Sequence, residues 1–142
     1  MFEIVEHEID VEKVIARVSL PEAGAVATFI GLTRNFTGEM KVELLQYEAY
    51  YSMAIKMMER IGLEAVEKYD IRKIAITHRI GDVAVEEASV VIAVSASHRK
   101  PAFQACEYAI DTLKEIVPIW KKESMTNGEQ KWIANDPDLK NL

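Results

Sequence analysis

The spacing of apolar and polar positions divides the chain into helix-like and strand-like segments. Residues 11–18 (VEKVIARV) repeat apolar side chains at helical spacing and follow Asp10, a residue type that favours the N-cap. Residues 51–68 and 101–117 carry the longer apolar stripes of two more helices. Pro118 should end the last one, because the residue before a proline is pushed out of the helical region. The stripes predict these core positions: Met53, Met57, Ile61, Ala65, Phe103, Cys106, Ile110, Leu113 and Val117.

The remaining apolar segments have strand character. Residues 23–31 and 42–50 read as strands, and residues 33–40, polar and containing glycine, read as the loop between them. Residues 71–81 alternate, which places His78 on the apolar face of a strand, whereas residues 89–96 are nearly all apolar and predict a strand buried on both faces. The last expected element is a hairpin of two short segments around Asn127-Gly128.

These elements predict an α+β fold with about three helices. Strands and helices do not alternate strictly along the chain, so a mixed or antiparallel sheet is favoured over a doubly wound parallel sheet. No repeat and no linker rich in glycine, proline or serine divides the sequence. We therefore expect one domain over residues 1–142.

Composition excludes several classes of protein. The 142 residues are 49% hydrophobic and 28% charged, a globular mixture without an apolar run long enough to span a bilayer. The first ten residues are acidic, unlike a signal peptide, so we expect the protein in the cytoplasm. The net charge of -6 argues against a nucleic-acid partner.

The sequence predicts neither a disulfide nor a metal site. Cys106 is the one cysteine, and its place in an apolar stripe favours a buried structural thiol over a nucleophile. His7, His78 and His98 lack the spacing of metal ligands. For His78 we expect a hydrogen-bonded core histidine. We expect no metal and no cofactor.

Positive charge is concentrated near the C-terminus of an otherwise acidic chain, which indicates a site for a small anion. A solvated surface would account for the charge counts equally well. One of the basic residues, Arg99, follows His98 in a turn from a buried strand into a helix, a place where ligands of open α/β sheets often bind. The basic residues of this segment are Arg99, Lys100, Lys114, Lys121, Lys122 and Lys131.

Lys114 and Lys121 are the strongest candidates for chemistry. Lys114 stands near the end of its helix, where a cation also meets the helix dipole favourably, so a structural role is an alternative. Lys121 follows Ile119 and Trp120, which should anchor the backbone. Cations that lie close together and are partly desolvated lower each other's pKa, which makes a lysine usable as an acid–base group. Arg34, in the turn after the strand of residues 23–31, is a weaker candidate for binding phosphate.

Taken together, several segments resemble the catalytic large subunit of molybdopterin synthase. The segments occur in the family's order and cover nearly the whole chain, and their combination is more specific than any one of them. They are AGAVATFIGLTRN, LQYEAY with its following helix, ITHRIGDV, SASHRKPAF, DTLKEIVPIWKKE and GEQKWIAN. The resemblance implies an α/β-hammerhead-like fold with an added antiparallel sheet.

The resemblance also implies an activity and partners. The family converts cyclic pyranopterin monophosphate into molybdopterin by adding two dithiolene sulfurs, so a sulfurtransferase is expected. The sulfur arrives as a thiocarboxylate on the C-terminal Gly-Gly tail of a small ubiquitin-like subunit. Two large subunits form a central homodimer within a heterotetramer. The short tail after Pro137 makes a family role for a longer C-terminus doubtful here.

By motif, the resemblance assigns Lys114 and Lys121 as catalytic residues. It also assigns a substrate pocket that comprises Leu32, Thr33, Arg34, His98, Arg99, Lys114, Lys121, Lys122 and Glu123. A sulfur that arrives on a partner fits the lack of a catalytic cysteine. The alternative is a dimeric module that binds a small phosphorylated ligand without chemistry.

Overall fold

The computed structural model describes residues 1–134 as three helices and nine strands; Asn135 and the tail after Pro137 lie outside this part of the chain. The helices are α1 (Val11–Val18), α2 (Tyr51–Lys68) and α3 (Arg99–Ile116). The strands are β1 (Phe2–Val5), β2 (Ala25–Leu32), β3 (Phe36–Thr37), β4 (Met40–Ala49), β5 (Lys73–Arg79), β6 (Gly81–Ala84), β7 (Ala88–Ala96), β8 (Ile119–Met125) and β9 (Gln130–Ala134). The predicted α+β class with three helices is confirmed.

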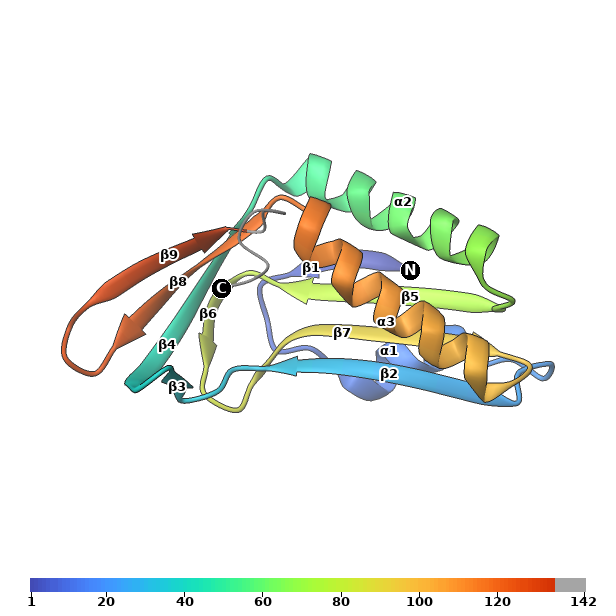
Figure 1. The fold of residues 1–142 in the computed structure, drawn as a ribbon, viewed down its shortest axis with the longest axis horizontal. Coiled ribbons are helices and arrows are strands. Elements are labelled where there is room, and N and C mark those ends of the chain that lie inside the picture. The colour runs from blue at the N-terminus through green and yellow to red at the C-terminus, as the bar shows by residue number, and fades with distance from the viewer. Residues whose placement is uncertain (135–142) are drawn as a thin grey trace.

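A four-stranded sheet forms the centre of the molecule. Its strand order is β1-β5-β7-β2, with β1 parallel to β5 and the other pairs antiparallel. Helices α2 and α3 cover one face and α1 covers the other, as Figure 1 shows. Because both faces are covered, β7 is buried along nearly its whole length, as its continuous apolar sequence predicts.

A second, antiparallel sheet stands at one end of the first (Figure 1). Its order is β3-β4-β8-β9, and β6 pairs with β4 on the edge opposite β8. Helix α3 starts after β7 at the far end of the first sheet and runs back toward the second. Pro118 follows, and β8 then pairs with β4. The chain therefore passes from the end of α3 directly into the second sheet.

The capping and turn signals of the sequence are confirmed. Asp10 caps α1 by accepting a hydrogen bond from the Lys13 backbone N–H at 3.2 Å. Between β8 and β9, Gly128 has a φ of 89°, a left-handed conformation that glycine adopts without steric cost. The Asn127 side chain accepts from the Glu129 backbone N–H at 2.9 Å and closes this turn.

The predicted apolar stripes are confirmed in part. In α2, Ile61 and Ala65 are buried, but the helix turns Met58 inward and leaves Met53 exposed. In α3 the buried face is built on small residues, and Phe103 is 64% exposed instead of packing in the core. Small side chains let a helix approach a sheet closely, so alanines form this contact. Alanine is only weakly hydrophobic, and a pattern of apolar positions therefore does not mark it as a core residue. The buried alanines of α3 are Ala102, Ala105 and Ala109.

The loop expected over residues 33–40 is partly wrong. Phe36 and Thr37 form β3 and pair with the first residues of β4 in a tight hairpin, with Gly38 in the left-handed region at a φ of 61°. Strands β1 and β6 have four residues each and were also not predicted. These short segments form strands because they pair with the free edges of longer strands. This pairing is a tertiary effect, which the local sequence pattern does not show. Among the described residues, no helix is long and apolar enough to cross a membrane.

Candidate active site

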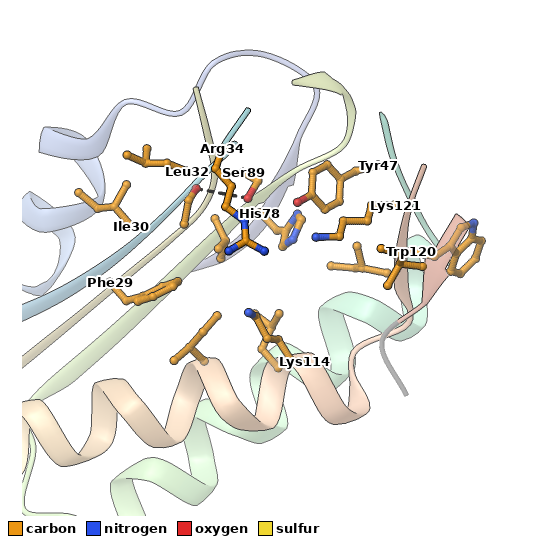
Figure 2. A pocket seen from close by; sticks show the side chains of 16 residues that line it. Phe29, Ile30, Leu32, Arg34, Tyr47, His78, Ser89, Lys114, Trp120 and Lys121 are labelled. Atoms are coloured by element: carbon orange, nitrogen blue, oxygen red, sulfur yellow. Dashed lines mark hydrogen bonds between the residues drawn. The ribbon is translucent and has the colours of Figure 1, made fainter. Parts of the chain in front are cut away.

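A cleft lies where the two sheets and the end of α3 meet. Its volume is about 370 Å³, and its wall mixes apolar side chains with charged ones. The end of β2, the last turns of α3 and the start of β8 each contribute to it, and Figure 2 shows Arg34, Lys114 and Lys121 pointing toward one another. Such a hollow, with a few polar groups in a largely apolar lining, is the usual form of a small-molecule site.

Three cations from three separate segments point into this cleft. Arg34 comes from the β2–β3 connection, Lys114 from α3 and Lys121 from β8 (Figure 2). Helix α3 ends at Ile116, and β8 begins at Ile119, which is buried. This change of direction lets Lys114 and Lys121 face the same space from different elements. The structure thus brings these three predicted residues around one cleft.

The environment of Lys121 favours loss of its proton. Burial lowers the pKa of this ammonium group below its ordinary value, and the nearby charges of Lys114 and Arg34 lower it further. Glu123 opposes the shift, since its Oε1 lies 3.8 Å from the Lys121 Nζ. Glu123 is itself 4% exposed and lines a narrow extension of the cleft beside Lys121. A lysine of this kind can exchange a proton with a ligand closer to neutral pH than a free one.

The backbone before Arg34 is held by the turn between β6 and β7. The Thr33 N–H donates to the Glu87 carbonyl at 3.1 Å, and the Glu86 N–H donates to the Thr33 carbonyl at 2.8 Å. The Glu87 carboxylate accepts from the Ala84 N–H at 2.9 Å and lies 3.4 Å from the Arg79 guanidinium. These contacts fix the loop that presents Arg34.

The other wall of the cleft carries neutral polar groups. His78 lies in β5 and packs edge-on against Tyr47 of β4, with ring centroids 5.1 Å apart. The Ser89 hydroxyl donates to the Gly31 carbonyl at 3.3 Å. Burial raises the pKa of Tyr47, which keeps its hydroxyl protonated. The cleft therefore has a cationic side and an uncharged hydrogen-bonding side.

His78 is the hydrogen-bonded, buried histidine that the sequence predicts, but it also lines the cleft. It is 4% exposed, and its Nδ1 lies 2.7 Å from the Arg79 carbonyl oxygen. Burial lowers the pKa of the imidazole from 6.5 to about 4, so the ring is neutral at pH 7.

We expect this histidine to make stability depend on pH. Between about pH 6.5 and 4 the unfolded chain binds a proton at His78 that the folded chain does not bind. The free energy of unfolding should therefore fall as the pH falls through this window, by at most roughly 3 kcal/mol. Urea unfolding at several pH values measures the slope. His78→Gln should show a shallower slope than the wild type, and equal slopes would contradict this role of His78.

His98 and Arg99 do not reach this cleft within one chain. His98 is the N-cap of α3 and Arg99 its first residue, and both are exposed. Lys114 lies fifteen residues further along the helix, about 22 Å away at 1.5 Å per residue. The turn after β7 and the cleft are therefore at opposite ends of α3.

Thr33 and Lys122 also differ from their predicted positions. Thr33 is 2% exposed and does not line the cleft, because its backbone pairing to the β6–β7 turn draws it inward. Lys122 follows Lys121 on a strand, where successive side chains point to opposite faces. Its Nζ lies 5.4 Å from the centroid of the Trp132 ring, on the other side of the sheet from the cleft. Leu32 lines the cleft as predicted.

Several lining residues were not identified from the sequence. They are mostly apolar, and in a sequence they cannot be told from core residues, since only the junction of the two sheets exposes them to a cavity. These residues are Phe29, Ile30, Tyr47, His78, Ser89, Val90, Ile110, Leu113, Ile119, Trp120 and Ile133. Trp120 is held by a hydrogen bond from its Nε1 to the Glu48 carboxylate at 3.2 Å.

Neither a thiol nor a metal cluster contributes to the cleft. Cys106 is buried in the core beneath α3, and burial raises the pKa of its thiol to about 11, so it is a poor nucleophile. Within residues 1–134, no three histidine, cysteine or carboxylate side chains are grouped so that they could hold a metal ion. The charged groups available for chemistry are those of Arg34, Lys114, Lys121 and Glu123.

Known proteins resemble this chain over nearly all of its length. Residues 4–116 match the family described as MoaE protein. The molybdopterin synthase catalytic subunit of Bacillus subtilis is 51% identical over 134 residues, which cover 94% of this chain and 85% of that protein. The corresponding protein of Thermoplasma volcanium is 48% identical over 130 residues, which cover 92% and 95%.

A solved structure agrees with this relationship. The crystal structure of molybdopterin synthase from Staphylococcus aureus superposes with a TM-score of 0.89 at 44% sequence identity, and the match covers 93% of this chain and 96% of that one. Sequence and fold thus agree over the elements that build the cleft. This chain belongs to the MoaE protein family, the family of molybdopterin synthase catalytic subunits.

Proposed function

We propose that this chain is the catalytic subunit of a molybdopterin synthase. It converts cyclic pyranopterin monophosphate into molybdopterin by adding the two dithiolene sulfurs, and is thus a sulfurtransferase. The observation that carries the proposal is the convergence of Arg34, Lys114 and Lys121 on one cleft that also has an uncharged polar wall. A pterin phosphate has an anionic end for the cations and a heterocycle for that wall.

The sulfur comes from a partner in this proposal. A small ubiquitin-like subunit brings it as a thiocarboxylate on its C-terminal Gly-Gly tail, and the tail enters the cleft between α3 and β8. Each tail carries one sulfur, so two charged carriers are consumed for each product. Because the partner supplies the sulfur, the chain needs no reactive thiol of its own, which agrees with the burial of Cys106 away from the cleft.

The two lysines divide the work. Lys114 is exposed at the mouth of the cleft, so it contacts the incoming thiocarboxylate. Lys121 is more enclosed and has a lowered pKa, so it stabilises charge on the substrate or transfers a proton. Glu123 keeps Lys121 in place through their contact at 3.8 Å.

His98 and Arg99 join the site from a second copy of the chain. Strand β2 is at the edge of its sheet and exposes Val26, Ile30 and Leu32, an apolar edge suited to pairing with another strand. If two copies pair their β2 strands in a two-fold antiparallel arrangement, the first residue of one β2 lies beside the last residue of the other. The first and last residues of one β2 are about 23 Å apart, so the pairing carries the start of one strand to the far end of its partner. Since β2 starts opposite Ala96, close to His98, this brings the partner subunit's His98 and Arg99 to the cleft.

Mixed dimers test the sharing of the site. Lys114→Ala and Arg99→Ala chains are assayed at a substrate concentration too low for Arg99→Ala to bind well, so that each has little activity alone. Unfolded and refolded together, they should recover about a quarter of wild-type activity. Half of the random dimers are then hybrids, and one of their two clefts lacks both changes. Activity of the mixture no higher than that of either variant would show that each chain builds its own site.

The whole chain of 142 residues acts as one catalytic domain in the cytoplasm under this proposal. The competing function is a dimeric module that binds a phosphorylated ligand without chemistry. Incubation with cyclic pyranopterin monophosphate and the thiocarboxylated carrier separates the two. A catalytic subunit yields a dithiolene product, whereas a binding module returns the precursor unchanged.

A further inference from the structure

The hydrogen bond between His78 and the Arg79 carbonyl determines which nitrogen of the imidazole carries the proton. Nδ1 lies 2.7 Å from the carbonyl oxygen, which can only accept, so Nδ1 must be the donor. A neutral imidazole has one N–H, and Nε2 is therefore an unprotonated acceptor. Among residues 1–134, no group donates a hydrogen bond to this nitrogen.

Packing keeps the ring neutral and fixed. His78 is buried on β5 between β1 and β7, its pKa lies far below 7, and its ring packs against Tyr47 of β4 at an interplanar angle of 69°. Rotation about χ2 would break the bond to the Arg79 carbonyl. Nε2 therefore remains an acceptor in a constant place at every pH from about 5 upward.

On the side of the cleft opposite His78, the charged side chains are all hydrogen-bond donors. The ammonium groups of Lys114 and Lys121 and the guanidinium of Arg34 can give hydrogen bonds but cannot accept them as cations. They satisfy the oxygen atoms of a phosphate. They leave the N–H groups of a nitrogen heterocycle without an acceptor, and each unpaired N–H in a closed cleft weakens binding.

We propose that Nε2 of His78 accepts a hydrogen bond from an N–H group of the substrate's heterocycle. This inference rests on the proposed function and adds a substrate-binding residue to it. With its phosphate held by the cations and its ring anchored at His78, a pterin phosphate lies across the cleft in one orientation. His78 thus selects ligands that have a donor at this position over phosphate esters that lack one.

Nitrogen NMR of the wild-type protein tests the contact without any substitution. The ¹⁵N resonance of the His78 Nε2 should move toward the protonated range when cyclic pyranopterin monophosphate binds at pH 7, because an accepted hydrogen bond shifts it that way. Inorganic phosphate, which occupies only the cations, should leave it in place. Binding of the pterin phosphate with an unmoved Nε2 resonance overturns the inference and leaves the proposed function intact.

Two substitutions give an independent measurement by calorimetry. His78→Phe keeps the ring but loses the acceptor, and should weaken binding of the pterin phosphate at least roughly 10-fold while inorganic phosphate binds as before. His78→Gln offers an amide oxygen near the former Nε2 and should recover most of the affinity. Equal loss for both ligands, or no recovery with glutamine, counts against the contact. If the wild type binds no pterin phosphate, the proposed function fails as well.

Discussion

Lys114→Ala and Lys121→Ala should each reduce the formation of molybdopterin by about 10²-fold or more. This is the scale for losing a positioned acid–base or charge-stabilising group. Both side chains reach the cleft from rigid elements, so alanine leaves the fold unchanged but removes the ammonium group. Single-turnover conversion with the thiocarboxylated carrier measures the effect. Lys114→Arg should fail too, because a guanidinium is larger, planar and permanently charged.

Lys122→Ala is the matched control for these variants. It removes the same charge from the next residue of β8, whose side chain lies over Trp132 and not in the cleft, so it should lose far less activity. Circular dichroism and carrier binding should be unchanged in all of these variants. Near-normal conversion by Lys114→Ala and Lys121→Ala, or a loss that follows unfolding, would remove the lysines from the mechanism.

Arg34→Ala and Arg99→Ala should each weaken binding of the pterin phosphate by roughly 10- to 100-fold. A charge-assisted hydrogen bond to phosphate contributes about 1.5–3 kcal/mol, whereas an exposed arginine contributes little to folding. Arg34 acts in its own chain and Arg99 in the cleft of the partner copy. Calorimetry with cyclic pyranopterin monophosphate, together with thermal unfolding of each variant, measures both quantities.

Lys100→Ala is the control for Arg99, since it removes a charge from the next position of the same exposed helix start. Its affinity should stay close to that of the wild type. If Arg99→Ala binds normally while Arg34→Ala does not, the second copy has no part in the site. Normal binding by both arginine variants would show that neither arginine contacts the phosphate.

Much of the fold follows from local signals in the sequence. Asp10 marks the start of α1, Pro118 marks the stop after α3, and Asn127-Gly128 marks the last hairpin, because each acts on the backbone within a few residues. The apolar stripe predicted for α3 is confirmed at four of its five positions, Cys106, Ile110, Leu113 and Val117, and Phe103 alone points to solvent. The contact with the sheet also depends on alanines, which the stripe did not include.

The sequence indicates which charged residues are candidates for the site, but it does not show how they are arranged in space. Lys114 and Lys121, which the sequence predicts to act together, line the same cleft because the helix end and the following strand are close in sequence. His98 and Arg99 lie one helix length away from Lys114, which only the three-dimensional path of α3 reveals. His78 was identified as a core residue because its periodicity is that of β5. Nothing in that pattern shows that the end of the strand opens into a cleft.

The central claim is that this chain transfers carrier-bound sulfur to a pterin, and a heavy-isotope experiment tests it most directly. The carrier's thiocarboxylate is labelled with ³⁴S, mixed with this chain and cyclic pyranopterin monophosphate, and the products are analysed by mass spectrometry. We predict molybdopterin that carries two labelled sulfurs, with two carriers converted to plain carboxylates for each product. Recovery of unchanged precursor beside an intact thiocarboxylate would contradict the account.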